Sequence, residues 1–172
     1  MNNVTIHNVI SKYYFSLIYY LCIKIADLKT SKIILDFGCG NGYLKKMIIK
    51  NYNVKVINYD IIEKFCDIKN WTKINFDTIF FIQVFYFLES KQILNILSKI
   101  GPRCKIIVAF STQSFLNKIF KFILGHADAH EGTKTSPDKE YKILQSNCRI
   151  LKCHNYFLFK ILFLKKLNKK IF

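Results

Sequence analysis

The feature that most constrains this chain is a run of glycines directly behind a short apolar segment. Residues 33–35 read Ile-Ile-Leu and lead into Asp36, after which come Gly38, Gly40 and Gly42. A short apolar run that feeds a glycine-rich turn and then a helical pattern at 43–50 is typical of a buried parallel strand. Because glycine has no Cβ, a ligand can approach the backbone closely at the carboxyl end of this strand. The pattern predicts an α/β protein with a ligand site at 36–42.

The same alternation of strand and helix continues along the chain. Apolar runs at 32–36, 54–59, 76–82 and 105–110 predict strands, and residues 8–28 predict a helix. Residues 90–100 place apolar side chains on one helical face and stop at Gly101-Pro102. We therefore predict a doubly wound, mostly parallel sheet with helices on both faces.

The C-terminal part is less regular. Residues 115–124 and 138–145 predict helices, 125–137 a polar loop, and 148–159 a strand, whereas 160–172 fits either strand or helix. A length of 172 residues suits one hydrophobic core. We expect one domain over 1–172, with an N-terminal helix within 1–30.

The spacing of the glycines distinguishes between the known types of glycine-rich ligand-binding motif. In a dinucleotide fingerprint the third glycine comes one residue later, where this chain has Tyr43. A P-loop needs Gly-Lys-Ser/Thr, which is not present here. The pattern D-x-G-x-G-x-G instead resembles motif I of class I S-adenosylmethionine-dependent methyltransferases. The resemblance runs in order over roughly residues 30–110, with Asp60 ending the second strand and 76–88 similar to the family's fourth strand and turn.

This resemblance implies a Rossmann-like methyltransferase with S-adenosylmethionine as cofactor, bound by residues 31–110, while 111–172 serve the substrate. A carboxylate at Asp60 suits the ribose because it can accept from two hydroxyls, and Ile61 would give the adenine an apolar face. Other readings stay open: Asp36 as a strand-end cap, Cys39 as a small buried filler, and Gly42 for helix–sheet packing. The implied cofactor-binding residues are Asp36, Phe37, Gly38, Cys39, Gly40, Gly42, Asp60, Ile61, Asp67, Ile68 and Gln83.

The chain departs from the family pattern between the second-strand acid and the fourth strand. Only residues 61–75 remain there, although a parallel crossover takes about a dozen residues or more before any strand is counted. We expect the helix to be missing and the third strand to be a shortened edge strand or a loop. Asp67, with Ile68 beside it, is either the family's adenine-binding acid or a solvated surface residue.

The turn after the fourth strand also departs from the family. Many members carry Glu and His near the positions of Tyr86 and Phe87, so no general base is assigned here. The rings favour an apolar acceptor or belong to the core. We assign substrate binding to Tyr86 and to His130 in the polar loop, with a solvated loop histidine as the alternative. Methyl transfer mainly requires alignment of donor and acceptor, and a base only if the acceptor is protonated.

Two motifs that do not occur after the predicted fourth strand narrow the choice of methyl acceptor. No Asn/Asp-Pro-Pro-aromatic motif and no Pro-Cys pair follow it, which disfavours methylation of nucleobases or glutamine. A small-molecule or lipid acceptor is the leading hypothesis. The rivals are an RNA methyltransferase and a degenerate, non-catalytic module that binds cofactor or a partner protein.

Net charge and cysteine usage set the expected partners. The formal net charge of +16 favours an anionic partner, although an AT-rich genome also enriches lysine. The basic, apolar tail fits either contact with an anionic membrane or an ordinary terminal element. None of the six cysteines forms a C-x-x-C pair, so we expect no metal. We expect a cytoplasmic protein with reduced thiols.

Overall fold

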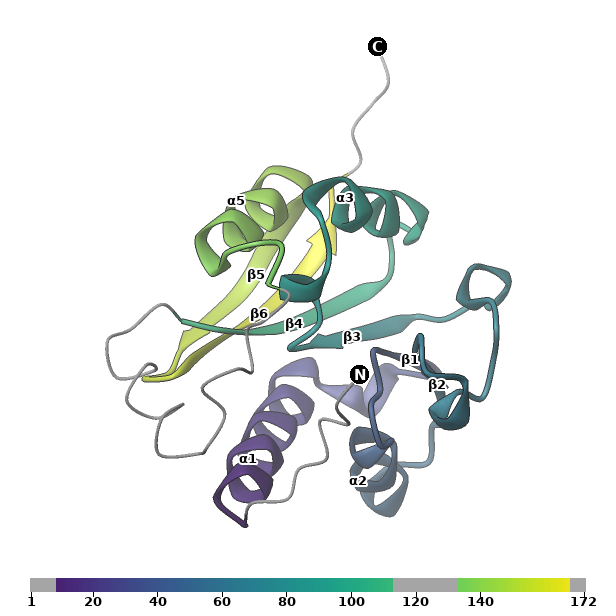
Figure 1. Ribbon diagram of the computed structural model, residues 1–172. Coiled ribbons are helices and arrows are strands. Elements are labelled where there is room, and N and C mark those ends of the chain that lie inside the picture. Colours follow the sequence, from purple (N-terminus) through teal and green to yellow (C-terminus); the bar gives the residue numbers. More distant parts are fainter. Residues whose placement is uncertain (1–8, 113–132, 168–172) are drawn as a thin grey trace.

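A computed structural model describes residues 9–112 and 133–167, which build a mixed sheet between two layers of helices (Figure 1). The sheet has six strands in the order β2-β1-β3-β4-β6-β5. The first four strands run parallel, and β6 is antiparallel to both of its neighbours. The strands are β1 (Ile33–Phe37), β2 (Lys55–Tyr59), β3 (Thr78–Ile82), β4 (Lys105–Ser111), β5 (Cys148–Asn155) and β6 (Phe159–Lys166).

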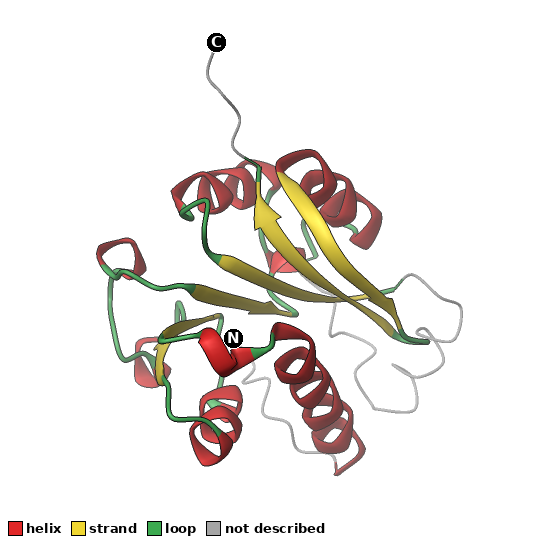
Figure 2. Ribbon diagram, turned by 180° about the vertical axis from the view of Figure 1, so that it is seen from behind, coloured by secondary structure: helices red, strands yellow, loops and turns green. Residues whose placement is uncertain are grey.

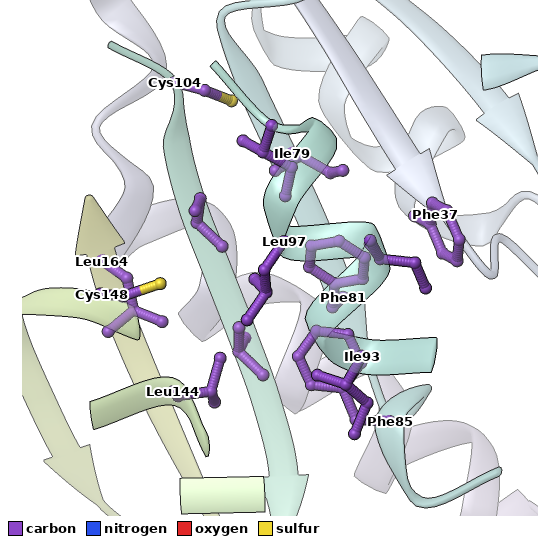
Figure 3. Close-up of a cluster of buried hydrophobic side chains, with 14 of the residues drawn as sticks. Phe37, Ile79, Phe81, Phe85, Ile93, Leu97, Cys104, Leu144, Cys148 and Leu164 are labelled. Atoms are coloured by element: carbon purple, nitrogen blue, oxygen red, sulfur yellow. The ribbon is translucent and has the colours of Figure 1, made fainter. Parts of the chain in front are cut away.

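Helices cover both faces of the sheet, as predicted (Figure 2). Side chains from α1 (Val9–Ala26) and α2 (Tyr43–Asn51) pack on one face, in a cluster that we call the α1/α2 core. Side chains from α3 (Ser90–Lys99) and α5 (Pro137–Asn147) pack on the other, in the α3/α5 core (Figure 3). Short 3-10 helices at Leu28–Thr30, Glu63–Phe65, Trp71–Lys73 and Phe85–Phe87 complete the described elements.

The central strands are apolar on both faces because both faces are covered. Along β3, Ile79 and Phe81 belong to the α3/α5 core, while Phe80 and Ile82 belong to the α1/α2 core. All five residues of this strand are buried. Continuous apolar runs are what a buried parallel sheet requires, so the strands at the centre were readable from sequence alone.

The segment 61–75 forms a loop with two 3-10 helices and no strand, which leaves β2 at the edge of the sheet. The expectation of a missing crossover helix is therefore confirmed. Trp71 is buried against the core, and its ring meets that of Phe37 edge-on at a centroid distance of 5.4 Å. The indole thus covers apolar surface that a third strand and its helix would otherwise protect.

The expectation of one strand over 148–159 is wrong, because a turn divides that region into the hairpin β5–β6. β5 ends at Asn155 and β6 begins at Phe159, and the N–H of Tyr156 donates to the carbonyl of Phe159 at 2.9 Å. The turn contains Tyr, Phe and Leu rather than the glycine or proline that usually mark turns. The ambiguous residues from 160 onward continue β6 as far as Lys166.

Within the described ranges, no helix has both the length and the apolar character needed to cross a bilayer. The predicted helix at 115–124, most of the predicted loop at 125–137, and His130 lie outside the described residues.

Candidate functional site

The glycine loop lies at the carboxyl edge of the sheet, between β1 and α2. Gly38, Gly40 and Gly42 all have positive φ, of 78°, 52° and 70°. The loop is tied to the neighbouring strand, because the N–H groups of Gly38 and Cys39 both donate to the carbonyl of Tyr59, at 2.7 and 3.2 Å. The loop after β1 and the end of β2 therefore form one continuous edge.

The glycines differ in what surrounds them. A Cβ on Gly38 would lie 2.5 Å from Cγ2 of Val84, so this glycine lets the turn after β3 pack against the loop. A Cβ on Gly42 would lie 2.8 Å from Nδ2 of Asn58, which supports the packing interpretation of that residue. A Cβ on Gly40 would meet no heavy atom of the described residues within 4 Å. Gly40 is thus the glycine whose surroundings leave room for a ligand.

Asp60, directly after β2, faces this open position. Its Oδ2 accepts from the N–H of Gly40 at 2.9 Å, and its Oδ1 accepts from the N–H of Ile62 at 3.1 Å. Cys66 holds the backbone of Asp60 through two bonds with its Sγ, at 3.0 Å to the N–H and 2.8 Å to the carbonyl. The carboxylate is therefore fixed beside the glycine loop, with Ile61 next to it and 85% exposed.

Asp36 is buried at the end of β1, on the face covered by α1. Its Oδ2 has no hydrogen-bond partner among the described residues. Burial, and then the nearby charge of Asp60, raise the pKa of Asp36 to about 7. A buried carboxyl oxygen without a partner costs free energy, and a cationic or hydrogen-bond-donating ligand beside Asp36 and Asp60 would offset that cost.

Asp67 is hydrogen-bonded to the backbone of β2 and to a lysine of α2. Its N–H donates to the carbonyl of Asn58 at 3.0 Å, and its Oδ2 accepts from the N–H of Asn58 at 2.7 Å. The same oxygen lies 2.7 Å from Nζ of Lys45, and hydrogen bonds from Lys45 and Asn58 outweigh desolvation and lower the pKa of Asp67. Asp67 therefore occupies the edge of β2 where a third strand would pair. Ile68 beside it is half-buried against the α3/α5 core.

Gln83 follows β3 at the same edge of the sheet. Its φ of 57° is left-handed, which side chains other than glycine seldom adopt. Its backbone N–H donates to the carbonyl of Ala109 at 2.8 Å, and its Oε1 accepts from the hydroxyl of Ser111 at 3.0 Å. Nε2 is buried and has no hydrogen-bond partner in the described ranges.

Phe37 and Cys39 have side chains directed into the protein. The ring of Phe37 packs on Phe81 at a centroid distance of 5.1 Å (Figure 3). Phe37 can therefore contribute its backbone, but not its side chain, to a site at the glycine loop. The thiol of Cys39 donates to the carbonyl of Phe65 at 3.3 Å. Burial raises the pKa of Cys39 well above its ordinary value, which is what a filler residue would show and a nucleophile would not.

Tyr86 and Phe87 form an aromatic turn between β3 and α3. Their rings lie 3.9 Å apart, and Phe87 is exposed. The carbonyl of Tyr86 accepts from the N–H groups of Lys134 and Thr135, so this turn is tied to the segment that leads into α5. Burial, and then Glu140, raise the pKa of Tyr86 above its ordinary value.

Sequence reasoning missed two features near the site. The first is a row of rings over α1, in which Tyr14, Phe15 and Tyr19 connect Phe159 of β6 to Tyr43 of α2 at centroid distances of 5.4 to 6.4 Å. The second is Glu140 on α5, 1% exposed, with no partner for either carboxyl oxygen among the described residues. The aromatic density of 13–20 was visible in the sequence. The burial of Glu140 could not be seen in the sequence, because it depends on how α5 packs against elements that are distant in sequence.

The residues at this edge fit S-adenosylmethionine. Gly40 leaves space beside the loop, and Asp60 offers a fixed carboxylate for a diol. Asp36 holds a buried acceptor and Gln83 a buried donor, neither with a partner among the residues that the structure describes. Within the described ranges, no group of His, Cys, Asp and Glu side chains is arranged to hold a metal ion. The carboxyl groups of Asp36 and Asp60 and the amide of Gln83 therefore suit a polar organic ligand that carries both a positive and a negative group.

Neither the family models nor the curated proteins contain a match to this sequence. Solved structures do match. Human N-acetylserotonin methyltransferase, in complex with S-adenosylmethionine, superimposes with a TM-score of 0.66 at 17% identity, over 89% of this chain and 52% of that one. The PH0226 protein from Pyrococcus horikoshii OT3 gives 0.69 at 12% identity, over 94% of each chain. The O-methyltransferase NcsB1, solved with S-adenosyl-L-homocysteine and 1,4-dihydroxy-2-naphthoic acid, gives 0.58 at 13%, over 92% and 58%.

These likenesses establish the fold. The chain has the Rossmann-like fold of class I S-adenosylmethionine-dependent methyltransferases, as its glycine motif indicated. It spans about half the length of N-acetylserotonin methyltransferase, of which it covers 52%.

Proposed function

We propose that this chain is an S-adenosylmethionine-dependent methyltransferase that acts on a small-molecule or lipid acceptor. The observation that carries the proposal is the pairing of Gly40 with Asp60 beside Asp36, whose buried Oδ2 has no partner in the described part of the chain. Open α/β sheets bind ligands outside the carboxyl ends of their strands, where the strand order reverses. In this sheet that point lies between β1 and β3, where the glycine loop packs against Val84, the residue after Gln83.

The proposed roles follow from the chemistry of each group. The cofactor supplies an already activated methyl group on a sulfonium. The carboxylate of Asp60 holds the ribose hydroxyls, and the exposed side chain of Ile61 covers the adenine. The backbone of 37–42 forms the floor of the site, and Asp36 stabilises the positive end of the cofactor. The protein acts mainly by holding donor and acceptor in line.

The acceptor side is aromatic in character. Tyr86 and Phe87 follow β3, and the row of rings on α1 adjoins the same edge of the sheet. Several solved proteins of this fold are O-methyltransferases, and NcsB1 was solved with a naphthoic acid. An apolar or planar acceptor, methylated at oxygen, carbon or nitrogen, is what these surroundings favour. His130 keeps its proposed substrate role.

Two rival functions have different support. The aromatic residues at 86 and 87 favour a non-catalytic module that only binds cofactor. The +16 charge favours RNA.

Contact with an anionic membrane through the basic tail has little support. Two lysines of that tail are engaged within the protein: Lys166 donates to the carbonyls of Ser98 and Ile100, and Lys160 lies 4.4 Å from the ring centre of Tyr141.

Calorimetric titration of the purified chain with S-adenosylhomocysteine, with NADH as the control, tests the proposal. We expect selective binding with a Kd on the order of micromolar. Methyl transfer to a panel of phenols, quinones and lipids then separates the enzyme from the non-catalytic module, which would bind the nucleoside without turnover. Affinity for RNA that falls steeply with salt would instead support the RNA alternative. Absence of any nucleoside binding would contradict the proposal.

A further inference from the structure

Gln83 is held in a conformation that its residue type disfavours. A left-handed backbone is unfavourable for a residue that has a side chain, yet Gln83 adopts φ 57° directly after a fully buried strand. Its N–H donates to the carbonyl of Ala109, and Val84 after it packs against Gly38. The strain is therefore maintained by contacts on both sides, which is typical of positions where geometry serves a ligand.

A chain of three side chains fixes the amide of Gln83. The hydroxyl of Ser111, at the end of β4, donates to Oε1 of Gln83 at 3.0 Å. The Ser111 side chain is also hydrogen-bonded to the hydroxyl of Tyr14 on α1. The Ser111 side chain therefore lies between Tyr14 and Gln83 and interacts with both. The chain runs Tyr14 to Ser111 to Gln83, and the Ser111 hydroxyl bonds the oxygen end of the amide.

The result is a buried donor in need of an acceptor. With Oε1 taken by Ser111, Nε2 is left without a partner in the part of the chain that the structure describes. A buried N–H that stays unpaired costs free energy, and a ligand carboxylate would satisfy it with a charge-assisted bond.

The sheet places this donor at the opposite end of the site from the ribose carboxylate. In the order β2-β1-β3, Asp60 follows β2, the glycine loop follows β1, and Gln83 follows β3. A nucleoside whose ribose lies on Asp60 therefore extends its amino-acid end across the loop toward Gln83. Asp36 lies on the strand between them and suits the positive groups, so a donor at Gln83 is left for the carboxylate.

We propose that the Tyr14–Ser111–Gln83 chain binds the α-carboxylate at the amino-acid end of the cofactor and so makes α1 part of the cofactor site. This inference rests on the proposed function. Gln83 is the contact residue, and Ser111 and Tyr14 are positioning residues that act through it.

Two nucleosides test the inference: S-adenosylhomocysteine, and 5′-methylthioadenosine, which has no amino-acid end. Gln83→Leu should weaken binding of the first by about ten- to a hundredfold, the size expected for a hydrogen bond to a charged group, and leave the second unchanged. Gln83→Glu keeps the shape of the side chain and puts a carboxyl group where the donor was. It should cause the same selective loss, which guards against a Leu variant that merely folds poorly.

The positioning residues are tested by a double-mutant cycle. Tyr14→Phe and Ser111→Ala should each weaken S-adenosylhomocysteine several-fold, and neither should weaken it further in a Gln83→Leu background. Tyr13→Phe, at an exposed neighbour on α1, is the matched control and should change nothing.

Equal losses for both nucleosides, or additive losses in the double variants, would overturn the inference, and so would unchanged binding of S-adenosylhomocysteine by Gln83→Leu. A wild-type chain that binds neither nucleoside contradicts the proposed function instead, so the two failures are distinguishable.

Discussion

The backbone N–H of Gly40 donates to Oδ2 of Asp60 at 2.9 Å, which joins the loop after β1 to the acid after β2. The other oxygen of Asp60 accepts from Ile62, so both oxygens have fixed directions. Each carboxylate oxygen can accept a further hydrogen bond. A ribose would therefore meet a carboxylate already oriented by the loop, which lowers the entropic cost of binding.

We predict that Gly40→Arg abolishes binding of S-adenosylhomocysteine without unfolding the domain. The new Cβ meets no neighbour within 4 Å, but the long side chain fills the space beside Asp60. The φ of 52° costs a residue with a Cβ about 1–2 kcal/mol, which a folded domain tolerates. Calorimetry measures the affinity, and thermal unfolding followed by circular dichroism checks the fold.

The matched control is Gly101→Arg. Gly101 also has no heavy atom within 4 Å of its Cβ position, but it precedes β4 at the opposite edge of the sheet. This variant should bind like the wild type. A folded Gly40→Arg variant with unchanged affinity would show that the site has been placed wrongly.

Asp36 should make cofactor binding depend on pH. Burial and the charge of Asp60 raise its pKa to about 7, so the carboxyl is partly protonated in the free protein at neutral pH. A bound sulfonium favours the ionised form, and S-adenosylmethionine should therefore bind about tenfold more tightly at pH 8 than at pH 6. Titrations at pH 7 in two buffers with different ionisation enthalpies should report proton release.

Asp36→Asn should remove both the proton release and the pH dependence, whereas the exposed Asp138→Asn should keep them. Stability gives a second check. A carboxyl whose folded pKa is raised contributes stability below its ordinary pKa of 3.8 that is lost as pH rises to about 7. The Asn variant should then lose less stability than the wild type between those values, and a parallel decline in both proteins would contradict the assignment.

Much of the fold was predictable because its signals are local. Each central strand is an unbroken apolar run, and a parallel sheet covered on both faces selects for that pattern. The missing crossover helix followed from chain length, since residues 61–75 cannot hold both a crossover helix and a strand. Chain length left open whether a short edge strand or a loop takes its place, and the structure shows a loop. The glycine spacing led to the predicted site residues Gly40 and Asp60, which the structure joins by a hydrogen bond.

The remainder depended on contacts between distant residues. The hydrogen bond of Ser111 with Gln83 joins positions 28 apart in sequence, and nothing local predicts the left-handed backbone of Gln83. The turn after Asn155 was missed because it consists of large apolar residues, which usually continue a strand. Asp67 looked like a ligand-binding acid, and its pairing with Asn58 became visible only once β2 was seen to be an edge strand.

Asp67→Ala separates a structural role from a cofactor role. The carboxylate is hydrogen-bonded to Asn58 and Lys45, so we expect a loss of unfolding free energy of about 1–2 kcal/mol, measured by urea denaturation. If the role is structural alone, affinity for S-adenosylhomocysteine changes by less than about threefold. A loss of tenfold or more in a variant with near-normal stability would restore the adenine-binding role. Lys45→Met removes the ion pair but keeps the carboxylate, and serves as the control.

Glu140 should set the stability of the protein at alkaline pH. The side chain is 1% exposed, and neither carboxyl oxygen has a partner among the described residues. Burial raises its pKa from 4.5 to about 8. Its charge contributes, after burial, to the raised pKa of Tyr86. In the unfolded chain Glu140 ionises above 4.5, while in the folded chain it stays neutral to about 8. Its contribution to stability is therefore complete below pH 4.5 and is lost as pH rises to about 8.

Glu140→Gln carries no charge at any pH, so its unfolding free energy should not decline over this window. We expect it to match the wild type near pH 5 and to exceed it by roughly 2–4 kcal/mol at pH 9, as measured by urea denaturation. Glu63→Gln is the control, because Glu63 lies in an exposed ion pair with Lys69 at 3.6 Å and should leave the pH profile unchanged. If the Gln variant and the wild type decline in parallel, the Glu140 carboxyl is paired or hydrated in solution. In that case the alkaline loss of stability has another source.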